Sequence, residues 1–299
     1  MENSSLYQVD LTLTSDDDEQ LRILTNRIRE ESLGITGWRR LGVLLVKIGQ
    51  FDKAEELYKT LIEQTSDESE KGLYYNNLGY VKDDQGDYKK AIWYYEKALE
   101  FCQKILPLND RHLATSYDNI AGVYKNMGEY SKALPLHKKA LEIFEQTLSS
   151  DHPDLAISCN NIAGIYKSIG EYSEAFSFYE KTLKILQKTL APNHPDLATC
   201  YNNIGSVYYK MGEYLKALPF YEKTLEIYQK TLPPNHPLLA TSYNNIASVY
   251  HDMKQYSKAL SYLECALNIF QSSLPPNHPS IQNVHTGIEI IKKKLENNV

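Results

Sequence analysis

The feature that most constrains this chain is an internal repeat with a step of 42 residues. Such a repeat indicates one supersecondary unit stacked on its own copies, because a single unit cannot bury its apolar face. Six copies align, and the first, at Gly49-Gln50-Phe51, precedes the second, at Gly86-Asp87-Tyr88, by only 37 residues. The step is seen most clearly in the polar pairs Asn76-Asn77, Asp118-Asn119, Asn160-Asn161, Asn202-Asn203 and Asn244-Asn245.

Each copy is predicted to form two helices. In residues 193–232, His194-Pro195 is typical of a helix start, because proline lacks only an N–H that the first turn does not use. Gly212 is suited to a left-handed helix end, and Pro233 ends the second helix. Histidines recur before prolines once in each repeat, too far apart to converge on one metal ion, so we expect helix entry and no metal site. These are His152, His194, His236 and His278.

Small residues recur in both predicted helices. Glycine or alanine in one register of the first helix, and alanine in one register of the second, would let the two helices approach closely. The sequence therefore predicts an all-α protein of packed hairpins. The first-helix register holds Gly42, Gly79, Ala121, Ala163, Gly205 and Ala247, and the second-helix register holds Ala54, Ala91, Ala133, Ala175, Ala217 and Ala259.

The repeat resembles a known family. Trp38-x-x-Leu41-Gly42 with Ala54-x-x-x-Tyr58 is similar to the tetratricopeptide pattern. Tyr201-Asn202-Asn203-Ile204-Gly205, after Pro192-Asn193-His194-Pro195, resembles the repeats of kinesin light chain and nephrocystin. The resemblance implies a right-handed superhelical solenoid of six helix pairs over residues 35–277, with a capping helix and tail over 278–299. Lys82, His137 and Leu263 depart from the pattern, each replacing an aromatic residue.

The asparagine pair falls on one side of the first helix. At about 100° per residue, Asn202 and Asn203 flank Ser206, away from Ile204 and Gly205. A small residue there lets a ligand backbone approach, and the amides offer donors and acceptors to peptide groups. The small-residue register comprises Gly122, Gly164, Ser206 and Ser248.

This arrangement predicts a ladder that binds extended peptide segments of other proteins in a concave groove. A second interpretation stays open, in which the amides only bridge adjacent repeats, and the flanking lysines are ordinary solvated surface. The candidate peptide-binding residues are Asn76, Asn77, Asn119, Asn160, Asn161, Asn202, Asn203, Asn244 and Asn245, with Lys125, Lys167, Tyr209, Lys210 and His251 as neighbours that set specificity.

Residues 1–34 differ in composition from the repeats. Residues 6–13 alternate apolar and polar side chains, which predicts a strand, and Ser15 is expected to cap a following helix. Residues 6–18 resemble the end of arginine-type ADP-ribosyltransferase domains, which implies a remnant of an NAD-dependent enzyme without its catalytic motif. The one Glu-x-Glu, Glu68-Ser69-Glu70, lies in a repeat connection. A disordered or edge-paired leader is the alternative.

Composition narrows the function further. The net charge of −6 argues against nucleic acid or an anionic membrane surface as partner. Four cysteines without a Cys-x-x-Cys pair indicate free thiols, and a cytoplasmic location is expected. No phosphate loop or hydrolase motif is present, so the sequence predicts a protein-interaction scaffold without enzymatic activity or cofactor. The alternatives are the repeat region of an ADP-ribosyltransferase fusion and a kinesin light chain-like cargo adaptor.

Overall fold

The computed structural model describes residues 35–107 and 110–297. Within these ranges the chain forms thirteen α-helices, α2 to α14, and no strand. The all-α repeat fold is thereby confirmed. The strand and helix predicted in the leader, residues 1–34, lie outside the described residues.

The chain divides into two compact units, residues 1–108 and 109–299. In the first unit, each helix packs against the next one along the chain. These helices are α2 (Ile35–Lys47), α3 (Phe51–Gln64), α4 (Glu68–Asp84) and α5 (Tyr88–Ile105). They are the first two predicted pairs. The 37-residue step arises mainly because α3 has 14 residues where the later second helices have 18, and the connection to α4 is also shorter.

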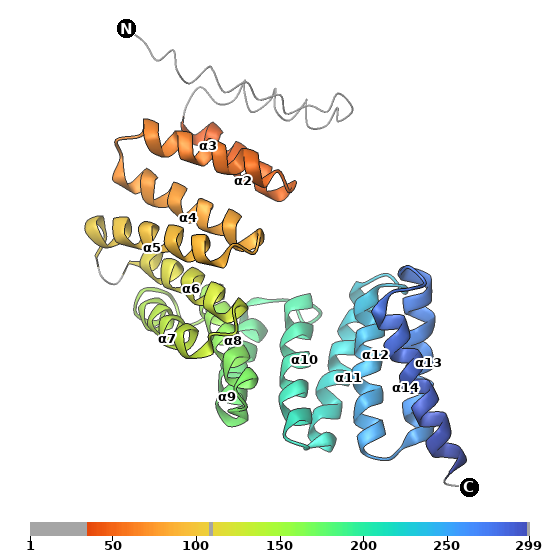
Figure 1. The fold of residues 1–299 in the computed structure, drawn as a ribbon. Helices are drawn as coiled ribbons and strands as arrows, with labels where there is room; N and C mark the ends of the chain where they lie inside the picture. Colours follow the sequence, from red (N-terminus) through yellow and green to blue (C-terminus); the bar gives the residue numbers. More distant parts are fainter. Residues whose placement is uncertain (1–34, 108–109, 298–299) are drawn as a thin grey trace. The chain divides into compact units, whose positions relative to one another are not determined.

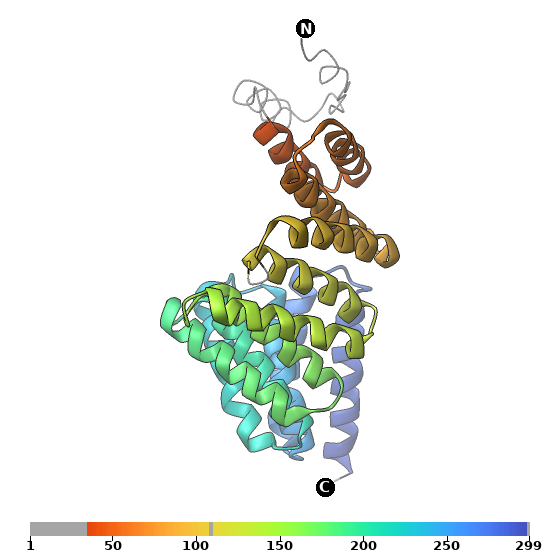
Figure 2. The same cartoon turned by 90° about the vertical axis from the view of Figure 1, so that its left-hand side faces the viewer.

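The second unit continues the same pattern with four more pairs and a final helix. Consecutive helices again pack on one another, and α10 to α14 stand side by side (Figures 1 and 2). Helix α14 covers α13, as predicted for a capping helix. The helices are α6 (Arg111–Asn126), α7 (Tyr130–Thr147), α8 (Pro153–Ser168), α9 (Tyr172–Thr189), α10 (Pro195–Lys210), α11 (Tyr214–Thr231), α12 (Pro237–Asp252), α13 (Tyr256–Ser273) and α14 (Pro279–Glu296).

The turn inside each pair has the predicted left-handed residue. Gly212 has φ of 76°, and the four equivalent glycines have φ between 75° and 87°. In the sixth pair the same position is Lys254, with φ of 59°. This side chain occupies a conformation that costs an L-residue about 1 kcal/mol or more, because its Cβ crowds the following carbonyl oxygen.

The recurrent histidines begin helices, as the sequence predicted. In each case the imidazole Nδ1 accepts the backbone N–H two residues later, at 3.1 to 3.2 Å. This bond satisfies one of the free donors at the helix start. Asp67 and Asp110 have the same role in α4 and α6, with the carboxylate 2.8 Å from the accepted nitrogen. The capping histidines are His152, His194, His236 and His278.

The small residues lie between the helices of each pair. All six second-helix alanines are fully buried. The backbone at Gly79 contacts the Tyr95 ring so closely that a Cβ built on the glycine would lie 2.6 Å from two ring carbons.

The buried side of the first helix is wider than helical spacing alone predicted. Cys200 and Val207 are buried because they pack against the preceding pair, near Tyr179.

Two departures from the repeat pattern are accommodated by polar pairs. The Lys82 side chain is 9% exposed, and its ammonium forms an ion pair with Glu55 of α3. Burial raises the pKa of Glu55, but hydrogen bonds from Lys59 and Lys82 outweigh it, so the pKa of Glu55 is lowered overall. The His137 ring is buried in the aromatic position of the third pair, and its Nδ1 lies 2.7 Å from Asp118 Oδ1.

Candidate peptide-binding site

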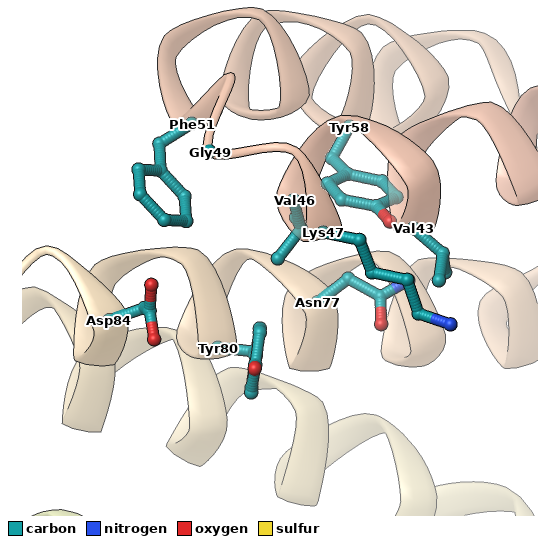
Figure 3. Close-up of a pocket in the computed structure, with 9 residues that line it drawn as sticks. All are labelled: Val43, Val46, Lys47, Gly49, Phe51, Tyr58, Asn77, Tyr80 and Asp84. Carbon is teal, nitrogen blue, oxygen red and sulfur yellow. The ribbon is translucent and has the colours of Figure 1, made fainter. Parts of the chain in front are cut away.

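The first unit contains an open pocket of about 480 Å³ between α2 and α4. Figure 3 shows Lys47 of α2 running past the Asn77 amide, with its ammonium at the end away from Phe51 and Asp84. The walls are largely apolar, and the Tyr80 side chain is 52% exposed. The lining residues are Val43, Val46, Lys47, Gly49, Phe51, Tyr58, Asn77, Tyr80 and Asp84.

Five of the nine lining residues of this pocket occupy predicted binding registers of the repeat. Val43 and Tyr80 occupy the small-residue register in the first two copies. Asn77 is the second asparagine of its pair, and Lys47 and Asp84 occupy the register of Lys210. The same face of the first helix that the sequence singled out is therefore open in this unit. Bulky side chains replace the predicted small ones, so the pocket favours an apolar side chain over a close backbone approach.

In the second unit the asparagines bridge neighbouring first helices. Asn203 Nδ2 donates to Asn160 Oδ1 at 3.3 Å, and Asn245 Nδ2 donates to Asn202 Oδ1 at 2.9 Å. The second asparagine of one repeat thus binds the first asparagine of the preceding repeat. Each bridge leaves one amide N–H₂ and one amide oxygen without a partner among the described residues.

Asn161 and Asn244 take no part in these bridges. Both are half-buried, and neither amide has a hydrogen bond within the described part of the chain. On α6, a Cβ added at Gly122 would meet nothing within 4 Å. One added at Gly164 would meet only the Tyr179 hydroxyl, at 3.8 Å. The unbonded Asn161 amide thus lies one turn before Gly164, where a ligand can approach the backbone. The remaining predicted asparagines, Asn76 and Asn119, are also half-buried.

The predicted specificity residues fall into a polar pair and a group of lysines. Tyr209 of α10 donates to Asp252 Oδ2 of α12 at 2.5 Å, and His251 Nδ1 lies 2.9 Å from Asp252 Oδ1. Burial, the hydrogen bond to Asp252 and its negative charge raise the pKa of Tyr209. Lys125, Lys167 and Lys210 have no carboxylate within ion-pair distance among the described residues.

The described ranges contain neither a cluster of metal ligands nor a membrane-spanning helix. Across residues 35–107 and 110–297, His, Cys, Asp and Glu side chains do not gather in groups that would hold a metal ion. Every described helix is too short or too polar to cross a lipid bilayer. Of the four free cysteines, Cys159 and Cys200 are buried, Cys102 is half-buried, and Cys265 is exposed.

Sequence reasoning located the registers but missed the first-unit pocket. Val43, Lys47 and Tyr80 were not predicted, because the asparagines and lysines that mark the later repeats are absent from their positions or differ in the first two copies. The small-residue register could have revealed Val43 and Tyr80, since large side chains stand there where the later copies have glycine or serine.

Comparisons with known proteins identify the repeat family and the fold. The family profile described as tetratricopeptide repeat matches residues 35–104, 112–188, 160–230 and 196–272. Among curated proteins, the uncharacterised ycf37 of Cyanophora paradoxa is 32% identical over 83 residues. The match covers 27% of this chain and 48% of that protein, so the chain spans about half the length of this curated relative.

Solved structures show the same fold at lower identity. BtubC (BKLC) from P. vanneervenii is 24% identical with a TM-score of 0.65, over 77% of this chain and 93% of that chain. A candidate kinesin light chain from P. anserina, with nearly identical TPR-like repeats, is 24% identical with a TM-score of 0.62. The similarity covers 71% of this chain and all of that chain.

Proposed function

Because this chain belongs to the tetratricopeptide repeat family, whose members generally mediate protein–protein interaction, we propose that it is a scaffold binding extended peptide segments of other proteins. The peptide lies along the concave side formed by the first helices. The observation that carries the proposal is the pocket of the first unit, because Val43, Asn77 and Tyr80 in its lining occupy the registers in which the later repeats have small residues and asparagines.

The asparagines have two roles in this proposal. Bridged residues such as Asn160 and Asn203 fix the spacing of adjacent repeats and keep one donor and one acceptor for a peptide. Asn161 and Asn244 use their whole amides for the ligand. The two interpretations of the sequence are therefore combined, with bridging and binding shared among the amides.

The test uses short linear peptides selected on the full chain from a phage-displayed library. We expect Asn161→Ala and Asn244→Ala to weaken binding of a selected peptide by about 2- to 10-fold each, the usual net value of a hydrogen bond. Helicity and the unfolding midpoint should not change, because neither amide is bonded within the described structure. Tyr80→Ala should weaken peptides that have an apolar anchor.

A matched control is Leu215→Ala on α11, whose side chain is 75% exposed and lies outside the binding registers. It should leave affinity unchanged. Selection of no peptide, or equal affinities for the control and for all three test variants, would refute the proposal.

A cargo adaptor similar to kinesin light chain is the second candidate, favoured by the structural likeness to the P. anserina repeats. Co-expression with a kinesin heavy-chain tail tests it, and a stable complex is the expected result. The proposal that residues 6–18 are the remnant of an ADP-ribosyltransferase rests on sequence resemblance. It is tested by reading the gene upstream of Met1.

A further inference from the structure

One side of α2 is less covered than the same side of the later first helices. Leu44 of α2 is half-buried, whereas the equivalent residues of α4, α8, α10 and α12 have no exposed surface. Each of these four helices packs on the second helix of the preceding pair. Among the described residues no helix precedes α2, so this side of α2 lacks the neighbour that the repeat provides elsewhere. The equivalent residues are Val81, Ile165, Val207 and Val249.

A small residue on the same side of α2 would let such a neighbour approach closely. In α10 the equivalent position is Cys200, whose Sγ lies 3.6 Å from the backbone carbonyl oxygen of Tyr179 in α9. In α2 the position is Gly37, which has no side chain to keep a second helix at a distance. Helix α2 can therefore be approached on this side as closely as α9 approaches α10.

The segment directly before α2 has the sequence of a helix that could fill this place. In residues 16–31, Leu21, Leu24 and Ile28 have the spacing of one apolar side of a helix, and the other residues are mostly polar. Three residues, 32–34, separate the segment from α2, and three residues also separate α3 from α4. A connection of this length places consecutive helices side by side and antiparallel.

The apolar residues of the two elements match in this antiparallel alignment. Residues that are equally far from the middle of the connection lie opposite each other. Leu44 then falls between Leu21 and Leu24, and Gly37 falls beside Ile28. The segment would thus cover Leu44 with two leucines and place its third apolar side chain against a glycine.

The charges are complementary in the same alignment. Glu19, the last residue of the acidic run 16–19, falls opposite Lys47 at the end of α2. The Lys47 side chain is exposed and has no carboxylate within 4 Å among the described residues. The acidic run would also lie in the first turn of the new helix, where the helix dipole favours negative charge.

We propose that residues 16–31 of this chain form a helix that covers α2, in the place that a second helix occupies on the later first helices. Their direct connection to α2 gives them a far higher effective concentration than a second copy of the chain would have. Val43 and Val46 of α2 line the pocket on the side of α4. The covering helix therefore leaves the pocket open and stabilises the helix that forms one of its walls.

The first experiment compares amide hydrogen exchange in the full chain and in its Leu24→Asp variant. An aspartate on the apolar side of the segment could not be buried against Leu44 without losing its hydration. We expect the amides of α2 to exchange at least about 10-fold faster in this variant, because the loss of a buried leucine shifts local opening by this much. Exchange in α11 should not change.

The matched control is Ile23→Asp, which introduces the same side chain on the opposite side of the segment, about 200° from Leu21. It should leave exchange in α2 unchanged. An unchanged rate in Leu24→Asp, or an equal increase in both variants, would overturn the proposal. No peptide ligand is used, so the result is independent of the proposed scaffold function.

A second experiment identifies the occupant by disulfide trapping. The Leu24→Cys/Leu44→Cys variant is oxidised as an equal mixture of isotopically light and heavy chains, and the linked tryptic peptides are identified by mass spectrometry. We expect a link between positions 24 and 44 in which both peptides have the same isotope. Linked peptides of mixed isotope would assign this side of α2 to a second copy. Absence of the link, or an equal yield from Ile23→Cys/Leu44→Cys, would also overturn the proposal.

Discussion

The same glycine-to-alanine change should have opposite effects at two positions of the repeat. At Gly79, a new methyl group would lie 2.6 Å from the Tyr95 ring, which is itself buried. Overpacking of this kind costs up to about 3 kcal/mol, against about 1 kcal/mol gained from helix propensity. The net loss is about 2 kcal/mol. At Gly122 nothing lies within 4 Å, so alanine should stabilise by about 1 kcal/mol.

Urea unfolding measures both changes. With a slope of about 2 kcal/mol per M, Gly79→Ala should lower the midpoint by about 1 M, and Gly122→Ala should raise it by about 0.5 M. The two tryptophans, Trp38 and Trp93, lie in α2 and α5, so their fluorescence reports on the first unit. Hydrogen exchange of α6 reports on the region of Gly122.

The repeat itself supplies the control for the Gly79 prediction. In the sixth pair the equivalent positions are Ala247 and Leu263, both buried. In a Tyr95→Leu background, Gly79→Ala should therefore cost less than about 0.5 kcal/mol or stabilise. A Gly79→Ala variant as stable as the parent would refute the reasoning, since the Tyr95 ring would then shift aside without loss of packing.

Three further predictions concern single positions. Lys254→Gly should raise the unfolding free energy by about 1 kcal/mol in urea titrations, because glycine adopts positive φ without strain. The lowered pKa of Glu55 contributes stability that is present above its unfolded value of 4.5 and lost as pH falls through the folded value. The free energy of unfolding, followed by fluorescence, should thus decrease below pH 4.5. The decrease should be less steep in Glu55→Gln, which also leaves the Lys82 ammonium without its carboxylate partner. Thiol labelling at pH 8 should modify exposed Cys265 first and buried Cys159 slowly, since burial raises the pKa of Cys159 to about 11.

The sequence predicted helix starts, helix ends and pairing because these depend on local chemistry. His194 before Pro195 and glycine at position 212 act within one turn of the chain, so their roles follow from residue type and spacing. The pairing of Lys82 with Glu55 was not predicted, because it depends on which side chain of a neighbouring helix comes within reach.

The orientation of the asparagines on the first helix was predicted for similar reasons and with a similar limit. Helical spacing placed Asn202 and Asn203 on the side away from the partner helix of their pair. Helical spacing did not show whether these asparagines contact another repeat, because it describes one helix and gives no information on how far the first helices of adjacent repeats are shifted along each other. That offset decides that Asn203 reaches Asn160, and that Val207 is buried against the preceding pair.

The amide bridges have a mechanical consequence. Each hydrogen bond joins the first helices of two neighbouring repeats at one point, on the side where a ligand would bind. The distance between adjacent repeats on that side is therefore constrained by bonds of 2.9 to 3.3 Å. Opening the array would stretch these hydrogen bonds and increase the spacing between equivalent binding positions of adjacent repeats. A ligand whose contact groups have the spacing of the unstrained array would therefore make the array more rigid. A ligand with a different spacing would have to strain these hydrogen bonds in order to bind.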